Sequence, residues 1–173
     1  MKIKTALILC AGFGKRVQPI TDSLPKPLIV YKNETLLENT INFLVKLKIE
    51  KIKINVFYLK EKITDFINKK KFPINIEIVD DGEIILGTGG GTLSLINKVN
   101  EDDVLVINPD TIWDDSYIKS IDAMVKIYFE RQMKNILLIV NNSTCFDKRF
   151  NGDFEIKNNI LLKEKINNFK YTG

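Results

Sequence analysis

The first residues able to do chemistry form a short glycine-containing segment, residues 10–16, which reads Cys-Ala-Gly-Phe-Gly-Lys-Arg and follows an apolar run. Gly12 and Gly14 leave room for a ligand beside the backbone, and successive N–H groups of such a turn can cradle a phosphate. Val17 at the third glycine position argues against a dinucleotide fingerprint, and Arg16 after the lysine argues against a Walker loop. A tight turn between a strand and a helix also needs glycines, so this segment alone leaves both interpretations open.

Lys26 is the second candidate, because a proline stands on each side of it. Pro25 and Pro27 have a fixed φ angle and restrict the residue before each of them, so they hold the backbone around the lysine. Such rigidity suits a lysine whose ammonium must meet one particular phosphate. The alternative is a proline-rich surface turn with a solvated lysine, which explains either proline but not the longer pattern around them.

Asp110 is the third candidate, and it ends an Asn-Pro-Asp sequence that begins at the last residue of the strand expected over 104–108. A carboxylate at the carboxyl end of a strand is well placed to hold a hard cation next to phosphates. A turn or helix-capping aspartate is the common alternative. Histidine is absent, and Cys10 and Cys145 are far apart in the sequence, so a zinc site and histidine-based catalysis are not expected. Any metal would be held by oxygen, which indicates magnesium, manganese or calcium.

A second glycine-rich segment, residues 87–92, reads Gly-Thr-Gly-Gly-Gly-Thr. By itself it is typical of a flexible loop, and we expect the whole stretch 80–92 to be a loop. Asp80, Asp81 and Glu83 precede the glycines, and a carboxylate there could accept a hydrogen bond from an N–H group of a nucleotide base.

These candidates need elements that bring them together, and the apolar patterns predict such elements. Apolar runs predict strands at 3–9, 51–58, 74–79, 104–108 and 136–140, and helical spacing predicts helices at 36–47, 61–68, 93–99 and 117–131. This alternation predicts an α/β fold, with a doubly wound and mostly parallel sheet in a single domain over 1–173. Short hairpins are expected from residue 141 onward. Ligands of such sheets lie beyond the carboxyl ends of the strands, where all the candidates fall.

Composition narrows the class of protein. Of the 173 residues, 45% are hydrophobic and 28% are charged, as in an ordinary globular protein. The formal net charge of +4 is mild, and the lysines alternate with apolar residues, so no nucleic-acid partner is expected. The N-terminal apolar run is too short for an export signal, and no run reaches transmembrane length. We therefore expect a cytoplasmic protein that does not bind a membrane, while its oligomeric state stays open.

The first glycine segment and the proline-flanked lysine belong to one longer pattern, which resembles the sugar-1-phosphate nucleotidyltransferase family. The signature of that family runs Leu, any residue, Ala-Gly, any, Gly, any, Arg, two residues, Pro, any, Thr, three residues, Pro-Lys-Pro-Leu. This chain matches it at Leu9, Ala11, Gly12, Gly14, Arg16, Pro19, Thr21, Pro25, Lys26, Pro27 and Leu28. The similarity extends from Ile3 to the end of the chain. The triple glycine is most similar to the N-acetylmuramate-1-phosphate uridylyltransferase branch.

The resemblance implies a Rossmann-like nucleotidyltransferase fold and a role for each matching residue. It implies that Arg16, Lys26 and Asp110 are catalytic, and that Asp110 binds the Mg²⁺ cofactor. It implies nucleotide contacts at Ala11, Gly12, Phe13, Gly14, Lys26, Glu83, Gly87, Thr88, Gly89 and Gly90. For the sugar it implies contacts at Asn108, Gly152, Glu164 and Lys165, although Ile166 replaces the proline that follows Glu-Lys in the family.

The family pattern normally continues past the end of this chain to a second metal-binding aspartate. The chain stops at Gly173, where the next strand would begin, so we expect either a fragment or a natural truncation at the C-terminal end. One carboxylate plus substrate phosphates makes a sparse magnesium site.

The resemblance implies that a nucleoside triphosphate, with UTP favoured, donates its nucleotidyl group to a sugar 1-phosphate of the amino-sugar or muramate type. Pyrophosphate would leave, and an NDP-sugar would form. Two alternatives stay open at this point. One is a cytidylyltransferase for choline phosphate or a similar alcohol phosphate, and the other is a nucleotide-binding module without catalysis.

Overall fold

The computed structural model describes residues 3–145, 151–158 and 160–171. The chain divides into two compact units, Met1–Lys119 and Ser120–Gly173. The expectation of a single domain over 1–173 stays a prediction.

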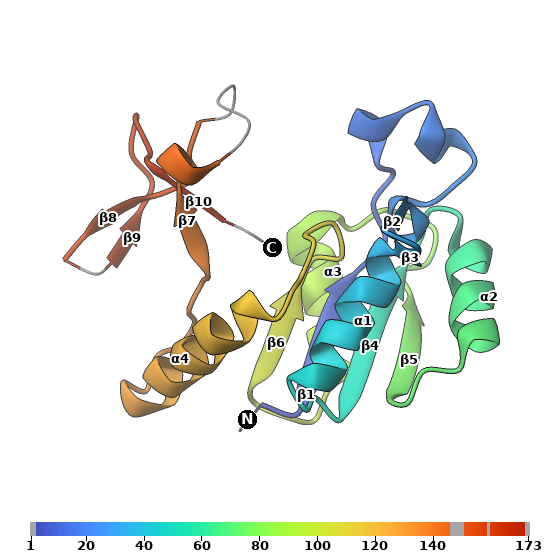
Figure 1. The fold of residues 1–173 in the computed structure, drawn as a ribbon, viewed down its shortest axis with the longest axis horizontal. Coiled ribbons are helices and arrows are strands. Elements are labelled where there is room, and N and C mark those ends of the chain that lie inside the picture. Colours follow the sequence, from blue (N-terminus) through green and yellow to red (C-terminus); the bar gives the residue numbers. More distant parts are fainter. Residues whose placement is uncertain (1–2, 146–150, 159, 172–173) are drawn as a thin grey trace. The chain divides into compact units, whose positions relative to one another are not determined.

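A four-stranded parallel sheet forms the centre of the first unit (Figure 1). Its strands are β1 (Thr5–Leu9), β4 (Lys51–Val56), β5 (Asn75–Asp80) and β6 (Val104–Ile107), in the order β5-β4-β1-β6. Strand β1 pairs with β4 on one edge and with β6 on the other, and its first four residues are fully buried. The predicted α/β fold with a parallel sheet is confirmed, and burial on both faces explains the continuous apolar run.

Helices cover both faces of this sheet. The chain moves outward from β1 to β4 and β5, and then crosses back to β6. Right-handed crossovers therefore place α1 (Leu36–Lys46) and α2 (Lys60–Lys70) on one face and α3 (Gly87–Ile96) on the other. Figure 1 shows α1 in front of the sheet, and on the α3 side Leu95 packs with Leu7 in a buried cluster. The sheet is doubly wound, as predicted.

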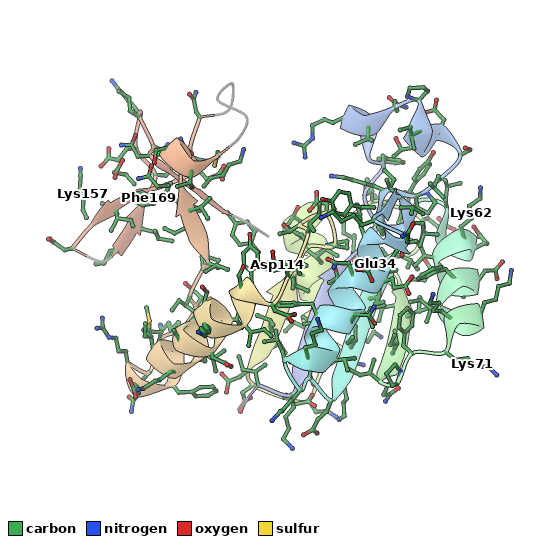
Figure 2. The ribbon with its side chains drawn as sticks, viewed as in Figure 1. Glu34, Lys62, Lys71, Asp114, Lys157 and Phe169 are labelled. Atoms are coloured by element: carbon green, nitrogen blue, oxygen red, sulfur yellow. The ribbon has the colours of Figure 1, made fainter. Side chains whose placement is uncertain are left out.

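Side chains cap the first turns of two helices. Thr35 accepts a hydrogen bond from the Glu38 N–H at the start of α1, as in a capping box. Helix α4 (Ser116–Glu130) follows Asp114, whose carboxylate accepts from both the N–H and the hydroxyl of Ser116 (Figure 2).

Within the described residues, no helix has both the length and the apolar character needed to cross a membrane.

Shorter elements complete the two units. In the first unit these are three single-turn 3-10 helices and one hairpin: η1 (Lys15–Val17), η2 (Ile20–Asp22), η3 (Lys26–Leu28), β2 (Val30–Tyr31) and β3 (Glu34–Thr35). In the second unit they are β7 (Ile139–Asn141), η4 (Asn142–Thr144), β8 (Glu155–Lys157), β9 (Ile160–Leu162) and β10 (Phe169–Tyr171). Strands β8 and β9 pair antiparallel as a short hairpin, as expected. Strand β7 pairs antiparallel with β10, which lies far from it in the sequence and so does not form a hairpin with it. Phe169, labelled in Figure 2, bridges to Phe154.

The expectation of a loop over 80–92 was wrong in its second half, because α3 begins at Gly87 rather than at residue 93. Glycine is a poor helix former, so the local sequence disfavours a helix here. Packing overrides that preference. Gly91 is buried against the side chain of Asn55, and Leu95 is fully buried. The glycines therefore open a helix that lies close to the sheet.

We predict opposite effects on stability for alanine at two glycines of α3. A Cβ at Gly91 would lie 2.6 Å from Nδ2 of Asn55, whereas a Cβ at Gly89 would meet nothing within 4 Å. Gly91→Ala should therefore lower the free energy of unfolding by about 1–3 kcal/mol, as overpacked sites do. Gly89→Ala should raise it by roughly 0.5–1 kcal/mol, because alanine favours the helix and clashes with nothing. Urea unfolding measures both, and equal effects at the two positions would contradict this packing.

Candidate active site

A cleft of about 320 Å³ opens at the carboxyl ends of the central strands of the first unit. This volume lies in the usual range for small-ligand sites. Its lining comes from five segments that are far apart in the sequence: Leu9, Cys10, Ala11, Gly12, Gly14 and Arg16; Lys26 and Pro27; Asn55; Ile85, Gly87 and Thr88; Asn108, Pro109 and Asp110. The parallel sheet therefore brings the candidate segments of the sequence to one edge, as expected.

The first glycine segment is held in a conformation that only glycine adopts easily. Gly14 has a φ of +66°, and a Cβ there would lie 2.8 Å from the Cγ2 of Thr21. The Thr21 hydroxyl donates to the Gly14 carbonyl at 3.0 Å, and the Tyr58 hydroxyl donates to the Thr21 carbonyl at 2.8 Å. The loop is thus fixed from its outer side, which leaves its other side to face the cleft.

Lys26 and Asp110 form an ion pair, with 2.5 Å between Nζ and Oδ2. Lys26 opens the 3-10 turn η3, directly after Pro25, while Asp110 follows β6. Both side chains are partly exposed, at 26% and 38%. The two strongest candidates for phosphate and cation binding therefore neutralise each other in the free protein, and a bound ligand would have to take over both contacts.

Trp113 anchors the loop that carries Asp110, although sequence reasoning gave it no role. Its indole Nε1–H donates to the Asn108 carbonyl at 3.2 Å, and its ring stacks on Phe43 at 5.3 Å. The Asn39 side chain accepts from the Trp113 N–H at 2.9 Å and donates to its carbonyl at 3.0 Å. These contacts tie the loop after β6 to α1, and the single tryptophan three residues after Asp110 was the only hint in the sequence.

Cys10 lies in the wall of the cleft and is buried, which makes its thiol a poor candidate nucleophile. Burial, and then the nearby charge of Asp110, raise the pKa of its thiol far above its ordinary value. A thiol that stays protonated is neither nucleophile nor metal ligand. Its backbone N–H donates to Oδ1 of Asn55 at 2.9 Å, and Asn55 is a cleft residue to which the sequence gave no role.

The structure brings most of the expected site residues together. Those that line the cleft are Ala11, Gly12, Gly14, Arg16, Lys26, Gly87, Thr88, Asn108 and Asp110. Phe13, Glu83, Gly89 and Gly90 are not among the lining residues. Phe13 packs instead against Phe57 and Tyr58, at 5.9 and 5.2 Å between ring centroids.

The remaining residues expected to contact the sugar lie in the second unit. Glu164 forms an ion pair with Lys157 at 2.7 Å, and Lys165 is exposed. Gly152 donates its N–H to the Asn167 carbonyl, and a Cβ at this glycine would lie 2.4 Å from the same oxygen. A close approach between backbones therefore explains this glycine.

The donor set for a metal is limited. Asp110 offers a carboxylate and Asn108 an amide oxygen at the end of β6, and such hard oxygens suit Mg²⁺. The described residues contain no group of three or more His, Cys, Asp or Glu side chains placed to hold a metal ion. These residues fit Mg²⁺ only as part of a site that phosphate oxygens complete.

Comparisons with known proteins agree with this geometry. The family model described as Nucleotidyl transferase matches residues 5–150. The chain is 40% identical over 117 residues to the bifunctional protein GlmU of Methanococcus maripaludis, across 68% of this chain and 27% of that protein. It is 26% identical over 165 residues to the N-acetylmuramate alpha-1-phosphate uridylyltransferase of Caulobacter vibrioides, across 94% of this chain and 68% of that protein.

Solved structures share the fold of this chain. The solved structure of UDP-glucose pyrophosphorylase from Acinetobacter baumannii matches with a TM-score of 0.77 at 20% identity, across 99% of this chain and 73% of that one. The chain spans only 27% of the length of the GlmU relative, so the match is to one part of that protein. The signature at Leu9–Leu28, the cleft at the carboxyl ends of the strands and the match over 5–150 agree with one another. The chain belongs to the Nucleotidyl transferase family.

Proposed function

We propose that this protein transfers a nucleotidyl group from a nucleoside triphosphate to a sugar 1-phosphate, forming an NDP-sugar and releasing pyrophosphate. The observation that carries the proposal is the ion pair between Lys26 and Asp110, in a cleft that also exposes glycine backbone from two segments. A cation and an anion poised together match the two needs of phosphoryl transfer, which are charge neutralisation and a hard ligand for a metal.

Each residue of the cleft has a role that follows from its chemistry. The N–H groups around Gly12 and Gly14 hold phosphate oxygens. Arg16 neutralises the departing pyrophosphate, for which its planar fork of donors is suited. Lys26 leaves Asp110 and contacts the phosphates at the reacting centre.

The reaction is an in-line displacement. A phosphate oxygen of the sugar 1-phosphate attacks the α-phosphorus of the triphosphate, and the bond from that phosphorus to the bridging oxygen breaks. Pyrophosphate leaves with the electron pair, so no general base is needed at the attacking anion. Mg²⁺, when bound at Asp110, would draw the phosphate oxygens together and absorb developing charge. The protein positions both reactants, which is where most of the catalysis of such reactions comes from.

UTP and an amino-sugar or muramate 1-phosphate are the favoured substrates. The run Gly89-Gly90-Gly91 resembles the uridylyltransferase branch, and the Caulobacter vibrioides relative named for N-acetylmuramate 1-phosphate aligns over 94% of this chain. α3 presents its glycine-rich first turns at the cleft through Gly87 and Thr88, where a flat base can lie against backbone.

A nucleotide-binding module without catalysis is the second candidate. The feature in its favour is the single carboxylate of the cleft, because the described residues hold no acidic cluster for a metal. Such a module would bind the triphosphate and release no pyrophosphate.

We predict that the protein releases pyrophosphate with Mg²⁺ and one pair from a panel of UTP, CTP, GTP and dTTP crossed with sugar 1-phosphates and choline phosphate. Asp110→Ala should lower the rate at least roughly a hundredfold, the usual loss for a group that stabilises transition-state charge. Asp114→Ala is the matched control, since Asp114 caps α4 outside the cleft and its loss should leave the rate unchanged.

Release with UTP and an amino-sugar 1-phosphate would identify the reaction and its substrates together. Release with CTP and choline phosphate alone would show that the acceptor is an alcohol phosphate and not a sugar 1-phosphate. Binding of a triphosphate without release by any pair would support the non-catalytic module and contradict the proposed transfer. Equal rates for Asp110→Ala and Asp114→Ala would remove Asp110 from the mechanism.

The ion pair leads to a separate prediction about metal binding. Lys26 occupies the carboxylate of Asp110, so Mn²⁺ alone must displace its ammonium. Lys26→Met should therefore tighten Mn²⁺ binding without nucleotide by roughly two- to fivefold, as expected for a partly exposed pair, and weaken Mg²⁺–UTP binding. Electron paramagnetic resonance of free Mn²⁺ and calorimetry with UTP measure the two effects.

Lys46→Met is the matched control for this test. Lys46 pairs with Asp115 at 2.7 Å and does not line the cleft, so its loss should change neither binding constant. Weaker Mn²⁺ binding by Lys26→Met would show that the ammonium does not compete with the metal for Asp110.

A further inference from the structure

Asn55 contacts three separate segments with one carboxamide. It stands near the end of β4, is only 2% exposed and lines the cleft. Its Oδ1 accepts from the Cys10 N–H at 2.9 Å, and its Nδ2 donates to Oδ2 of Asp81 at 2.7 Å. The same Nδ2 would lie 2.6 Å from a Cβ at Gly91 in α3. One buried side chain therefore joins the start of the first glycine segment to the glycine-rich helix.

The chemistry of its partners determines the orientation of this carboxamide. The Cys10 backbone N–H can only donate a hydrogen bond, and a carboxylate such as that of Asp81 accepts. Oxygen must therefore face Cys10 and nitrogen must face Asp81. A flip of the amide would place two donors together at one end and two acceptors at the other, which loses both hydrogen bonds.

The contact to Cys10 replaces a missing ladder bond. The pairing of β1 with β4 ends at Leu9 opposite Asn55, where the chain leaves the sheet to form the glycine segment. The next backbone N–H, that of Cys10, is part of a buried residue and needs an acceptor. Oδ1 of Asn55 supplies it, so the point at which the glycine segment departs from the sheet depends on this side chain.

The contact to Asp81 is equally specific. Asp81 follows β5, and its own N–H donates to the Val56 carbonyl at 3.0 Å. In the described part of the chain, Oδ1 of Asp81 is buried with no hydrogen-bond partner. The hydrogen bond from Asn55 is therefore an important stabilising contact of this carboxylate, and it holds the segment that leads into α3.

We propose that Asn55 is a positioning residue, which sets the spacing between residues 10–14 and residues 87–91 so that one nucleotide can contact both. This rests on the proposed function, in which phosphates lie on the first segment and the base on the second. Asn55 itself takes no part in the chemistry. Its loss should therefore loosen the two segments together and weaken nucleotide binding.

An exchange of the two polar groups tests this directly. Asn55→Asp keeps the acceptor for Cys10 but places two carboxylates against each other, which is unfavourable. In the double variant Asn55→Asp/Asp81→Asn, the new amide at position 81 donates to the new carboxylate at position 55, so the contact returns with reversed polarity. Recovery in the double variant cannot come from a role of Asn55 in contacting substrate.

Two readouts are measured on the whole chain. Hydrogen exchange should speed up at least about tenfold at residues 10–14 and 87–91 in Asn55→Asp, the size expected for a lost buried hydrogen bond, and should return to within about threefold of the parent in the double variant. Calorimetry with Mg²⁺–UTP should show the same pattern of loss and recovery, with CTP, GTP and dTTP tested in the same way.

Ile54→Val controls for stability alone. It lies next to Asn55 in β4, is fully buried, and its truncation lowers the unfolding temperature without removing either hydrogen bond. It should leave exchange at the two segments and nucleotide affinity unchanged. If Ile54→Val loosens both segments as much as Asn55→Asp does, or if the double variant does not recover, Asn55 has no positioning role.

The test separates the two proposals. If the parent protein binds none of the four triphosphates, the proposed function fails, while hydrogen exchange still decides whether Asn55 couples the two segments. If the parent binds UTP and Asn55→Asp binds it equally well, the positioning role fails and the proposed function stands.

Discussion

The structure of the first unit depends on one strand, β1, which is paired in parallel on both edges and buried on both faces. Parallel pairing sends the carboxyl ends of β4, β1 and β6 to the same edge of the sheet. Each strand stops there, and each following segment has to satisfy its backbone in another way. The glycine segment after β1 and the Asn-Pro-Asp loop after β6 thus meet at one place, although about ninety residues separate them.

Beyond the ends of the strands, side chains supply the hydrogen-bond partners of the backbone groups. Asn55 accepts from the Cys10 N–H, Trp113 binds the Asn108 carbonyl, and Thr21 binds the Gly14 carbonyl. A cleft whose backbone is held by such contacts can present its N–H groups and the Asp110 carboxylate to a ligand with little rearrangement. The ion pair of Lys26 with Asp110 keeps the two opposite charges of the cleft compensated until a ligand arrives.

The glycine-rich run 87–92 shows where local rules fail. Three glycines in a row favour a loop by propensity, and that expectation was wrong. The decisive term is the room that Gly91 leaves for the buried carboxamide of Asn55, a residue thirty-six positions earlier. No local sequence pattern predicts this contact between Gly91 and Asn55, because it arises from the packing of α3 on β4. The same holds for Trp113, whose contacts with Asn39 and Phe43 come from α1.

The sequence by itself determined the class of fold, the order of strands and helices, and the residues Arg16, Lys26 and Asp110 as the candidates for chemistry. It could do so because hydrophobic period, glycine and proline spacing and the long Leu9–Leu28 pattern are local properties of the chain. Only the tertiary structure decided that Lys26 touches Asp110, that Phe13 packs into an aromatic group instead of lining the cleft, and that Asn55 lines it. Those facts depend on which strands become neighbours and how closely a helix can approach them, and they are fixed by long-range packing.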